Sequence, residues 1–408
     1  MQNLKNSACF MPAFSHMYLN ALQNLSQKSR ALPNGITTQN LNPFNASSGF
    51  VYTPQILVSP GQFMGKSAAG YTLLKQAAMN GTVLGDSMGF QLIAKPHLYT
   101  GPPFAVNVLH WQEANTHVSP ICDIPSRIVY EPGTPFKTVT QCRDVTLQNG
   151  QAMIAARTSS SKMLLLNVIQ GNSEAEFIDW YHNLRLLPLE GYAFGGAHRL
   201  NIGMLLRVIL DLRDSRKLAD VQWFHVFGTC KLEAALALTI LKRAVDDLAG
   251  RSIPFTFDAS TPFTSSSVHA QIYTGVVHTS KKIHLHAARI GCNPIYAGKP
   301  FPFPSTMSHV ARRVTLGDIN VKRNTFQTGW DTISQLLLAN HNLEALMMAT
   351  DRAISFLDYE SEDAAEFLPK QILNLKTIVD AILTSKAPLS VLKRYQSDLN
   401  WMVHSKYR

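Results

Sequence analysis

Short apolar runs recur along the chain from about residue 55, and most of them end on a polar residue. Several are continuous hydrophobic strings rather than alternating ones, which is typical of parallel strands covered on both faces. The runs that predict strands cover residues 55–59, 83–86, 119–123, 164–170, 191–196, 223–228 and 254–258.

Segments with helical spacing separate these runs. Ser173 and Glu176 form a capping-box pattern, which predicts a helix that begins there. Residues 231–248 predict another helix, with Gly250 as its C-terminal stop. Alternating strands and helices indicate a parallel sheet, and their number favours a closed α/β barrel, the (β/α)8 TIM barrel, over an open doubly wound sheet.

Three regions follow from this pattern. Residues 1–50 are rich in Asn, Ser and Gln and predict an irregular N-terminal arm with at most one short helix. Residues 51–325 are expected to form the barrel. Residues 326–408 change to purely helical spacing, from Ile333 to Leu357 and again over 367–383, and predict a C-terminal helical extension.

Polar residues close the apolar runs repeatedly. The active site of a barrel of this kind lies where strands end and loops begin, so these residues are expected to converge on one rim. Each carboxylate taken alone is more simply a turn or cap residue. The residues concerned are Asp86, Asp123, Gln170, Gly195, Gly196, Gly228 and Asp258.

Two short motifs suggest other chemistry. Residues 61–67 resemble a phosphate-binding loop but are one residue short of the required spacing, so ATP binding is not expected. Residues 85–89 satisfy G-x-S-x-G, the nucleophile elbow of serine hydrolases. The segment after it is a poor long helix, and no His-Gly-Gly segment precedes it. A serine hydrolase that uses Ser87 is therefore kept as an alternative.

The same residues fit another pattern better. Gly-Asp-Ser-Met-Gly-Phe-Gln at 85–91 resembles the Asp-Ser-Gly-Gly-Phe-Gln signature of tRNA-guanine transglycosylases, with Met88 in place of one glycine. Further similarities to this family follow in the same order along the chain. They are Val-Ile-Gln-Gly at 168–171, Gly-Tyr-Ala-Phe-Gly-Gly at 191–196, His-Val-Phe-Gly-Thr at 225–229, Phe-Asp-Ala-Ser-Thr-Pro at 257–262 and Leu-Ala-Asn-His-Asn-Leu at 338–343.

The resemblance implies a base exchange at a sugar carbon. Such an exchange with retained configuration takes two inversions, so a carboxylate must hold the sugar in between. The resemblance assigns this role to Asp258, and proton transfer to and from the bases to Asp86. A guanine-like edge would be read by Asp123, Gln170 and the backbone of Gly195 and Gly196. Ser87 and Phe90 are assigned to the same substrate pocket.

The chain departs from the tRNA enzymes at their zinc site. His341 occupies the position of the family's histidine ligand, but residues 310–318 contain no cysteine. One imidazole cannot form a four-coordinate structural site, so we expect neither zinc nor another cofactor. His341 is instead expected to be packed or hydrogen-bonded within its helix.

Charge and cysteine content bear on the binding partner and the cellular compartment. The net charge is +10, which favours a polyanionic partner. Five scattered cysteines, with no secretory signal and no apolar run long enough for a membrane span, predict a cytoplasmic protein with reduced thiols. One basic set is expected to follow nucleic-acid phosphates, although it also fits an ordinary solvated face. It comprises Lys281, Lys282, Arg289, Arg312, Arg313, Lys322 and Arg323.

Loss of the zinc ligands and the divergent signatures make the chain more similar to phage members of the family. Those enzymes exchange guanine in DNA for a 7-deazaguanine such as 7-cyano-7-deazaguanine (preQ0), which protects viral DNA from host nucleases in the host cytoplasm. A target base in duplex DNA would have to be flipped out. A tRNA substrate is the near alternative, a nucleic-acid-binding module without activity is a third, and a homodimer is left open.

Overall fold

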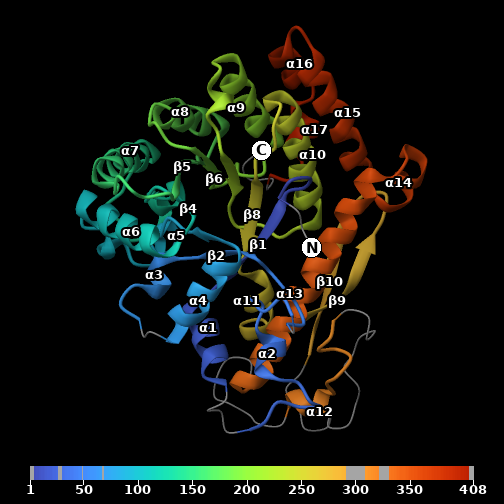
Figure 1. Cartoon of the computed structure of the whole chain (residues 1–408). Coiled ribbons are helices and arrows are strands. Elements are labelled where there is room, and N and C mark those ends of the chain that lie inside the picture. Colours follow the sequence, from blue (N-terminus) through green and yellow to red (C-terminus); the bar gives the residue numbers. More distant parts are fainter. Residues whose placement is uncertain are drawn as a thin grey trace.

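The computed structural model describes residues 4–25, 30–47, 49–66, 69–290, 308–320 and 330–403. Its centre is a closed barrel of parallel strands in which each strand pairs with the next and the last pairs with the first (Figure 1). The chain is therefore a (β/α)8 barrel, as its pattern predicts. The strands are β1 (Cys9–Phe14), β2 (Gln55–Val58), β3 (Thr82–Gly85), β4 (Val118–Pro120), β5 (Leu164–Ile169), β6 (Gly191–Phe194), β7 (Trp223–Val226) and β8 (Phe255–Ala259).

The barrel begins earlier than the sequence predicts. An irregular arm over residues 1–50 is wrong for this region, because β1 lies within it and is followed by α1 (His16–Gln23) and α2 (Thr38–Leu41). Pro12 argues against a central strand, since proline donates no ladder hydrogen bond. In the barrel it lies where β1 stops pairing with β8 and begins, at Ala13, to pair with β2.

Helices cover the outside of the barrel. The local signals behave as expected: Ser173 and Glu176 form the capping box of α8, and Gly250 ends α10 with a φ of +64°. The helices up to the end of the barrel strands are α3 (Pro60–Phe63), α4 (Ala69–Asn80), α5 (Gly89–Ala94), α6 (Pro102–Asn115), α7 (Val139–Ala156), α8 (Glu174–Leu184), α9 (Ile202–Asp214), α10 (Leu232–Ala249) and α11 (Thr261–Ser267), with short 3-10 turns η2 (Pro96–Leu98), η3 (Ser126–Tyr130) and η4 (Lys217–Ala219).

A hairpin interrupts the barrel pattern after α11. Its strands β9 (Gln271–His278) and β10 (Ile283–Arg289) are antiparallel, and α12 (Leu316–Ile319) lies beyond it. The next helix, α13 (Thr332–Ser355), contacts both α10 and α1 and so closes the ring of helices around the barrel. The expected boundary at 326 therefore separates α13 from the barrel on which it packs.

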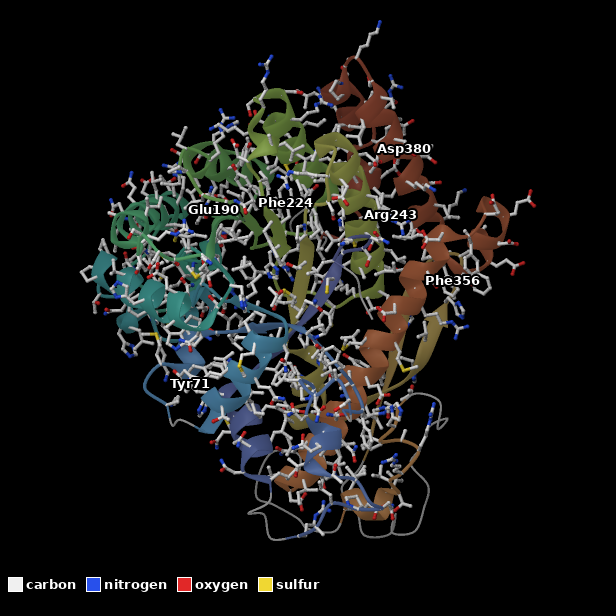
Figure 2. The ribbon with its side chains drawn as sticks, viewed as in Figure 1. Tyr71, Glu190, Phe224, Arg243, Phe356 and Asp380 are labelled. Atoms are coloured by element: carbon white, nitrogen blue, oxygen red, sulfur yellow. The ribbon has the colours of Figure 1, made fainter. Side chains whose placement is uncertain are left out.

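The remaining C-terminal segments pack on the outside of this ring. Arg243 of α10 forms an ion pair with Asp358 (2.8 Å), and Figure 2 shows Arg243 where the barrel meets the C-terminal helices. No helix in the described ranges is both long and apolar enough to span a membrane. The segments are η7 (Phe356–Asp358), α14 (Ser361–Phe367), α15 (Lys370–Thr384), α16 (Pro388–Arg394) and α17 (Gln396–Leu399).

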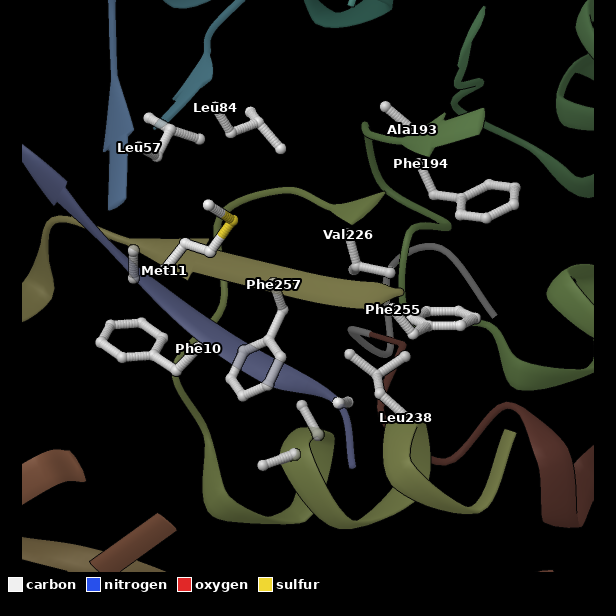
Figure 3. Packing of buried hydrophobic residues seen from close by; sticks show 14 of the residues in the cluster. Phe10, Met11, Leu57, Leu84, Ala193, Phe194, Val226, Leu238, Phe255 and Phe257 are labelled. Atoms are coloured by element: carbon white, nitrogen blue, oxygen red, sulfur yellow. The ribbon is translucent and has the colours of Figure 1, made fainter. Parts of the chain in front are cut away.

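The two faces of each barrel strand differ: one packs against the helices and the other points into the barrel. Phe194, Phe224 and Phe255 stack in sequence at centroid distances of 6.1 and 5.3 Å on the face that packs against helices. Figure 3 shows Phe255 beside Leu238 of α10 and Phe10 beside Phe257, all in this outer layer. Because side chains alternate along a strand, Thr256 and Asp258 of β8 point to the opposite, inner face. The core therefore holds the strands while leaving inward positions for chemistry.

Candidate active site

Asp258 lies on the inner face at the carboxyl end of β8. The residue is 7% exposed. Its Oδ1 accepts a hydrogen bond from the backbone N–H of Gly228 (2.9 Å) and contacts Nε2 of His225 at 3.2 Å. Gly228 has a φ of +65°, which an L side chain rarely adopts, and this conformation points its N–H at the carboxylate. The loop after β7 therefore forms one wall of the Asp258 site.

Asp86 follows directly after β3 and is half-buried. Burial raises the pKa of its carboxyl to about 7, and repulsion from Asp258 and Asp123 adds to the rise. The N–H of Ser87 donates to Asp86 Oδ1 (2.8 Å) and opposes the shift. Near neutral pH this carboxyl is poised between its acid and base forms, which is the condition for general acid–base catalysis.

Asp123 lies beyond the end of β4 and is buried. Burial raises the pKa of its carboxyl to about 6, against hydrogen bonds from Ser87 and Gln170. The amide of Gln170, which follows β5, donates to Asp123 Oδ2 (2.6 Å) and to the carbonyl of Ile124 (3.2 Å). Gln170 Oε1 accepts from the N–H of Ser126 (2.9 Å). In this arrangement Gln170 orients Asp123, and the amide nitrogen of Gln170 already donates to two acceptors within the protein.

The turn after β3 holds Asp86 and Asp123 close together. Met88 adopts a left-handed conformation with φ +70°, and Gly89 follows as the first residue of α5. A Cβ on Gly89 would lie 3.0 Å from Asp123 Oδ1 and 2.8 Å from Pro125. Only glycine leaves room for the two loops to approach this closely. The turn thus sets the spacing of two of the three carboxyls.

Ser87 lies in the same turn but lacks the surroundings of a hydrolase nucleophile. Its hydroxyl accepts the N–H of Gly89 (3.1 Å) and lies 3.5 Å from Asp86 Oδ1. Within the described ranges no histidine is hydrogen-bonded to it. The left-handed residue of the turn is Met88 and not the serine. The contacts of Ser87 therefore support a role in orienting the carboxyls.

The glycines after β6 line the same rim. A Cβ on Gly196 would lie 3.1 Å from Gln170 Cβ, and one on Gly195 would lie 3.8 Å from the ring of Phe227. Arg199 donates to the carbonyls of Gly196 (2.9 Å) and Gly228 (3.2 Å) and so ties the loops after β6 and β7 together. Every strand-end residue expected to converge on this rim is connected to it by such contacts.

Two aromatic side chains stand out from the rim. Phe90 on α5 is 69% exposed, and Tyr130 on η3 is 70% exposed. The elements α5 and η3 contact each other and follow β3 and β4, which carry Asp86 and Asp123 at their ends. Exposed aromatic rings beside a site are suited to stacking on a planar base. Sequence reasoning selected Phe90 and missed Tyr130, whose only signal was its place in a loop.

The basic residues do not form one cluster. Lys281 and Lys282 lie at the tip of the β9–β10 hairpin, where the N–H of Lys370 on α15 donates to Ser280. Arg289 lies at the opposite end, paired with Gln271, about 20 Å away along the strands. Arg312 and Arg313 are exposed just before α12. Lys322 and Arg323 lie outside the described residues.

The base of the hairpin is attached to the carboxyl end of the barrel strands, where Asp258 lies. Asn342 of α13 donates to the carbonyls of Pro262 (3.1 Å) and Gln271 (3.1 Å) and accepts from the N–H of Tyr273 (2.9 Å). Pro262 belongs to α11, which begins just after β8, and Figure 1 shows α11 and α1 at the same end of the barrel. Arg289 is therefore nearer to the Asp258 face than the tip lysines are.

His341 is hydrogen-bonded, as its sequence context predicts, but its ring partners lie outside its own helix α13. Its Nδ1 pairs with Ser308 Oγ (2.7 Å) and its Nε2 with the carbonyl of Tyr273 (2.8 Å). Burial lowers the pKa of His341 to about 4, so the ring is neutral. Within the described ranges, no group of three or more His, Cys, Asp or Glu side chains could hold a metal ion. His341 thus connects α13 to the hairpin and to the segment before α12.

His225 on β7 contacts Asp258 and is the residue of this site that the sequence analysis did not select. It is fully buried on the inner face, near the end of a strand whose neighbour carries Asp258. A histidine inside an apolar run, in step with Trp223 on the inward side, was the available signal.

Comparison with known proteins adds no assignment to this geometry: no family model matches the chain, and no curated protein matches its sequence. The chemical character of the site rests on its own residues. Three carboxyls meet at the carboxyl end of a barrel; two have pKa values raised toward neutrality, and the third accepts the N–H of Gly228 and contacts Nε2 of His225. Such a set can combine a nucleophile with a proton donor and acceptor.

Proposed function

We propose that this barrel is a glycosyltransferase that exchanges one base for another on a nucleotide sugar by double displacement. The observation that carries the proposal is the unequal state of two neighbouring carboxyls. Asp86 has a pKa of about 7, raised by burial and by the charge of Asp258, while one oxygen of Asp258 accepts the N–H of Gly228 and lies 3.2 Å from His225 Nε2. Pairs of carboxyls in such different environments divide into an acid and a nucleophile.

In the first displacement an oxygen of Asp258 forms a bond to C1′ of the sugar. The bond from C1′ to the base nitrogen breaks, its electron pair stays on that nitrogen, and protonated Asp86 supplies the proton. In the second displacement ionised Asp86 takes a proton from the incoming base. The base nitrogen then bonds to C1′, and Asp258 leaves as a carboxylate. Two inversions retain the configuration at C1′.

The particular activity that the residues support best is exchange of guanine in DNA for a 7-deazaguanine such as 7-cyano-7-deazaguanine. Asp123 offers an acceptor for the N1 and 2-amino hydrogens of a guanine-like edge. Phe90 is exposed beside the same rim, where it could stack on the base. The order of the motifs from residue 85 to 343 supports this guanine transglycosylase assignment.

The polymer is the less constrained part of the proposal. The net charge of +10 and Arg289, at the end of the hairpin nearer to the Asp258 face, favour a nucleic acid. DNA is preferred because the zinc-ligand cysteines of the tRNA enzymes have no counterpart in residues 310–318. Exchange in tRNA is the alternative. The geometry of Ser87 gives no support to the serine hydrolase.

The deciding experiment incubates the purified protein with duplex DNA, with tRNA and with 7-cyano-7-deazaguanine, and identifies modified nucleosides by mass spectrometry. We expect the modified base in DNA, and none with the Asp258→Asn variant. Incorporation into tRNA alone would mean that the substrate is tRNA and not DNA, while the proposed chemistry of base exchange would stand. No incorporation into either polymer, or labelling of Ser87 by a fluorophosphonate, would overturn the proposal.

A further inference from the structure

His225 is held rigidly beside Asp258 by groups on three sides. Its Nδ1 lies 2.8 Å from Thr256 Oγ1, on the neighbouring strand β8. The ring of Phe227 packs edge-on against the imidazole at a centroid distance of 4.6 Å. The third side is Asp258 Oδ1, 3.2 Å from Nε2. A fully buried ring with these contacts has one orientation available to it.

The hydrogen bonds around His225 indicate which of its two ring nitrogens carries the proton. The indole N–H of Trp223 can only donate, and it donates to Thr256 Oγ1 (2.9 Å). The Thr256 hydroxyl hydrogen then has two acceptors within reach, His225 Nδ1 at 2.8 Å and the carbonyl of Phe224 at 3.3 Å. The shorter contact favours donation to Nδ1, which leaves the proton of a neutral ring on Nε2. The opposite tautomer would point the Nε2 lone pair at an ionised carboxylate. An ionised Asp258 therefore receives an N–H from His225.

Both donors to Asp258 reach the same oxygen. His225 Nε2 and Gly228 N approach Oδ1, and among the described residues no hydrogen bond is made to Oδ2. Hydrogen bonds reduce the nucleophilicity of the oxygen that accepts them, because its lone pairs are engaged. Oδ2 keeps its lone pairs and is the oxygen left for a bond to C1′.

We infer that His225 is a positioning residue for the nucleophile: it acts through Asp258, directing Oδ2 at the sugar and stabilising the carboxylate when it leaves. This inference rests on the proposed base exchange. During the second displacement the negative charge returns to the Asp258 carboxylate, and an N–H already aimed at Oδ1 stabilises it without rearrangement. His225 should therefore matter most for breakdown of the covalent intermediate.

The test compares His225→Leu with His225→Gln. Leucine fills similar space without a donor, whereas the glutamine amide can place an N–H near the position of Nε2. With duplex DNA and radiolabelled guanine, we expect His225→Leu to slow exchange about 10–100-fold with little change in KM for DNA. In a separate experiment with end-labelled DNA, the DNA–protein adduct, trapped by denaturant, should persist longer in a chase with unlabelled guanine. His225→Gln should stay within a few-fold of the natural protein.

A second pair of variants tests the same chain of hydrogen bonds without touching the histidine. Thr256→Val removes the hydroxyl that orients His225, and Thr256→Ser keeps it. We expect the valine variant to slow adduct breakdown and the serine variant to leave it unchanged.

The outcomes distinguish the positioning role from the proposed function. Folded His225→Leu protein with normal exchange would refute the positioning role while the proposed function stands. Equal loss of adduct and turnover in the leucine and glutamine variants would assign His225 to folding alone. If the natural protein forms neither adduct nor exchanged DNA, the proposed function itself fails, and the role of His225 fails with it.

Discussion

Two regions of the molecule bury ionisable side chains in opposite ways. At the barrel rim, three carboxyls lie close enough for Asp258 and Asp123 to raise the pKa of Asp86. Beside α13, a set of hydrogen bonds that we call the clasp joins Ser308, His309, His341 and Glu344 to the hairpin. Each ring nitrogen of His341 has a partner there, and Glu344 accepts from both the N–H and the ring of His309.

The difference shows how burial serves two purposes. The hydrogen-bonded groups of the clasp hold segments of the chain together, because breaking one hydrogen bond leaves a buried polar group without its partner. Like charges at the rim keep protonation states unsettled, which lowers stability but supports proton transfer. Loss of the Asp86 carboxyl at the rim should therefore lower activity and raise stability at pH 8, whereas variants in the clasp should lower stability and leave activity nearly normal.

The largest effect is expected from Asp258→Asn. An amide cannot form the covalent intermediate, so exchange should fall by at least about 10⁴-fold and no adduct should be trapped. Assays with radiolabelled guanine measure the exchange, and assays with end-labelled DNA measure the adduct. The matched control is Glu344→Gln in the clasp, which should exchange normally once folded. Full exchange by Asp258→Asn would remove Asp258 as the nucleophile.

Asp86→Asn should reduce exchange by roughly 10²–10⁴-fold while making the protein more stable at pH 8. The carboxyl has a folded pKa of about 7, above its ordinary value, so the folded state binds the proton more tightly. Its stabilising contribution is complete below about pH 4 and is lost as the pH rises to 7. At about 1.4 kcal/mol per pKa unit the asparagine advantage at pH 8 is at most about 4 kcal/mol.

Urea unfolding of both proteins at pH 4 and pH 8 measures this advantage. The two proteins should converge at the lower pH. An Asp86→Asn protein that is less stable than the natural one at pH 8 would contradict the raised pKa.

The pH dependence of the first displacement is the next effect. Because it consumes the proton of Asp86, adduct formation should decline above pH 7 by up to tenfold per unit, with a midpoint near the pKa of about 7. Rapid-quench measurement of adduct between pH 5.5 and 9 gives the profile. The residual adduct formation by Asp86→Asn should not decline above pH 7. An unchanged decline in this variant would mean that another group supplies the proton.

In the clasp, His341→Leu should cost about 1–3 kcal/mol of unfolding free energy, because it leaves Ser308 Oγ and the carbonyl of Tyr273 without their partner. Exchange measured well below the melting temperature should be within a few-fold of normal. Thermal unfolding and the exchange assay together check this. Loss of exchange at full stability would mean that the two regions are not separate.

The smallest effect compares Arg289, Arg312 and Arg313 with the two lysines at the tip of the hairpin. Replacing Arg289, Arg312 and Arg313 with glutamine should weaken DNA binding and reduce the slope of log K against log salt by about 0.9 for each phosphate that is no longer neutralised. Replacing Lys281 and Lys282, at the far end, should leave the slope nearly unchanged. Fluorescence anisotropy with a labelled duplex at several salt concentrations compares them. A larger change in this slope from the lysine replacements would mean that DNA binds at the tip of the hairpin.

Much of the fold could be predicted because its signals are local. The apolar runs from residue 55 onward, the capping box at Ser173 and the stop at Gly250 all depend on near neighbours. The polar residues that end these runs could be assigned to one rim, because a parallel barrel brings its strand ends together. β1 could not be predicted, since Pro12 and its polar flanks hide a strand that pairing with β8 and β2 makes stable.

Local patterns in the chain were enough to specify the barrel, the carboxyls at its strand ends and the lack of cysteines in residues 310–318. Folding was needed to establish that Gln170 orients Asp123, that α13 closes the ring, and that His225 faces Asp258. It also placed the pKa of Asp86 near neutrality. This division follows from distance: strand and helix signals act between residues a few positions apart, whereas pKa values and donor directions depend on groups that meet only when the barrel closes.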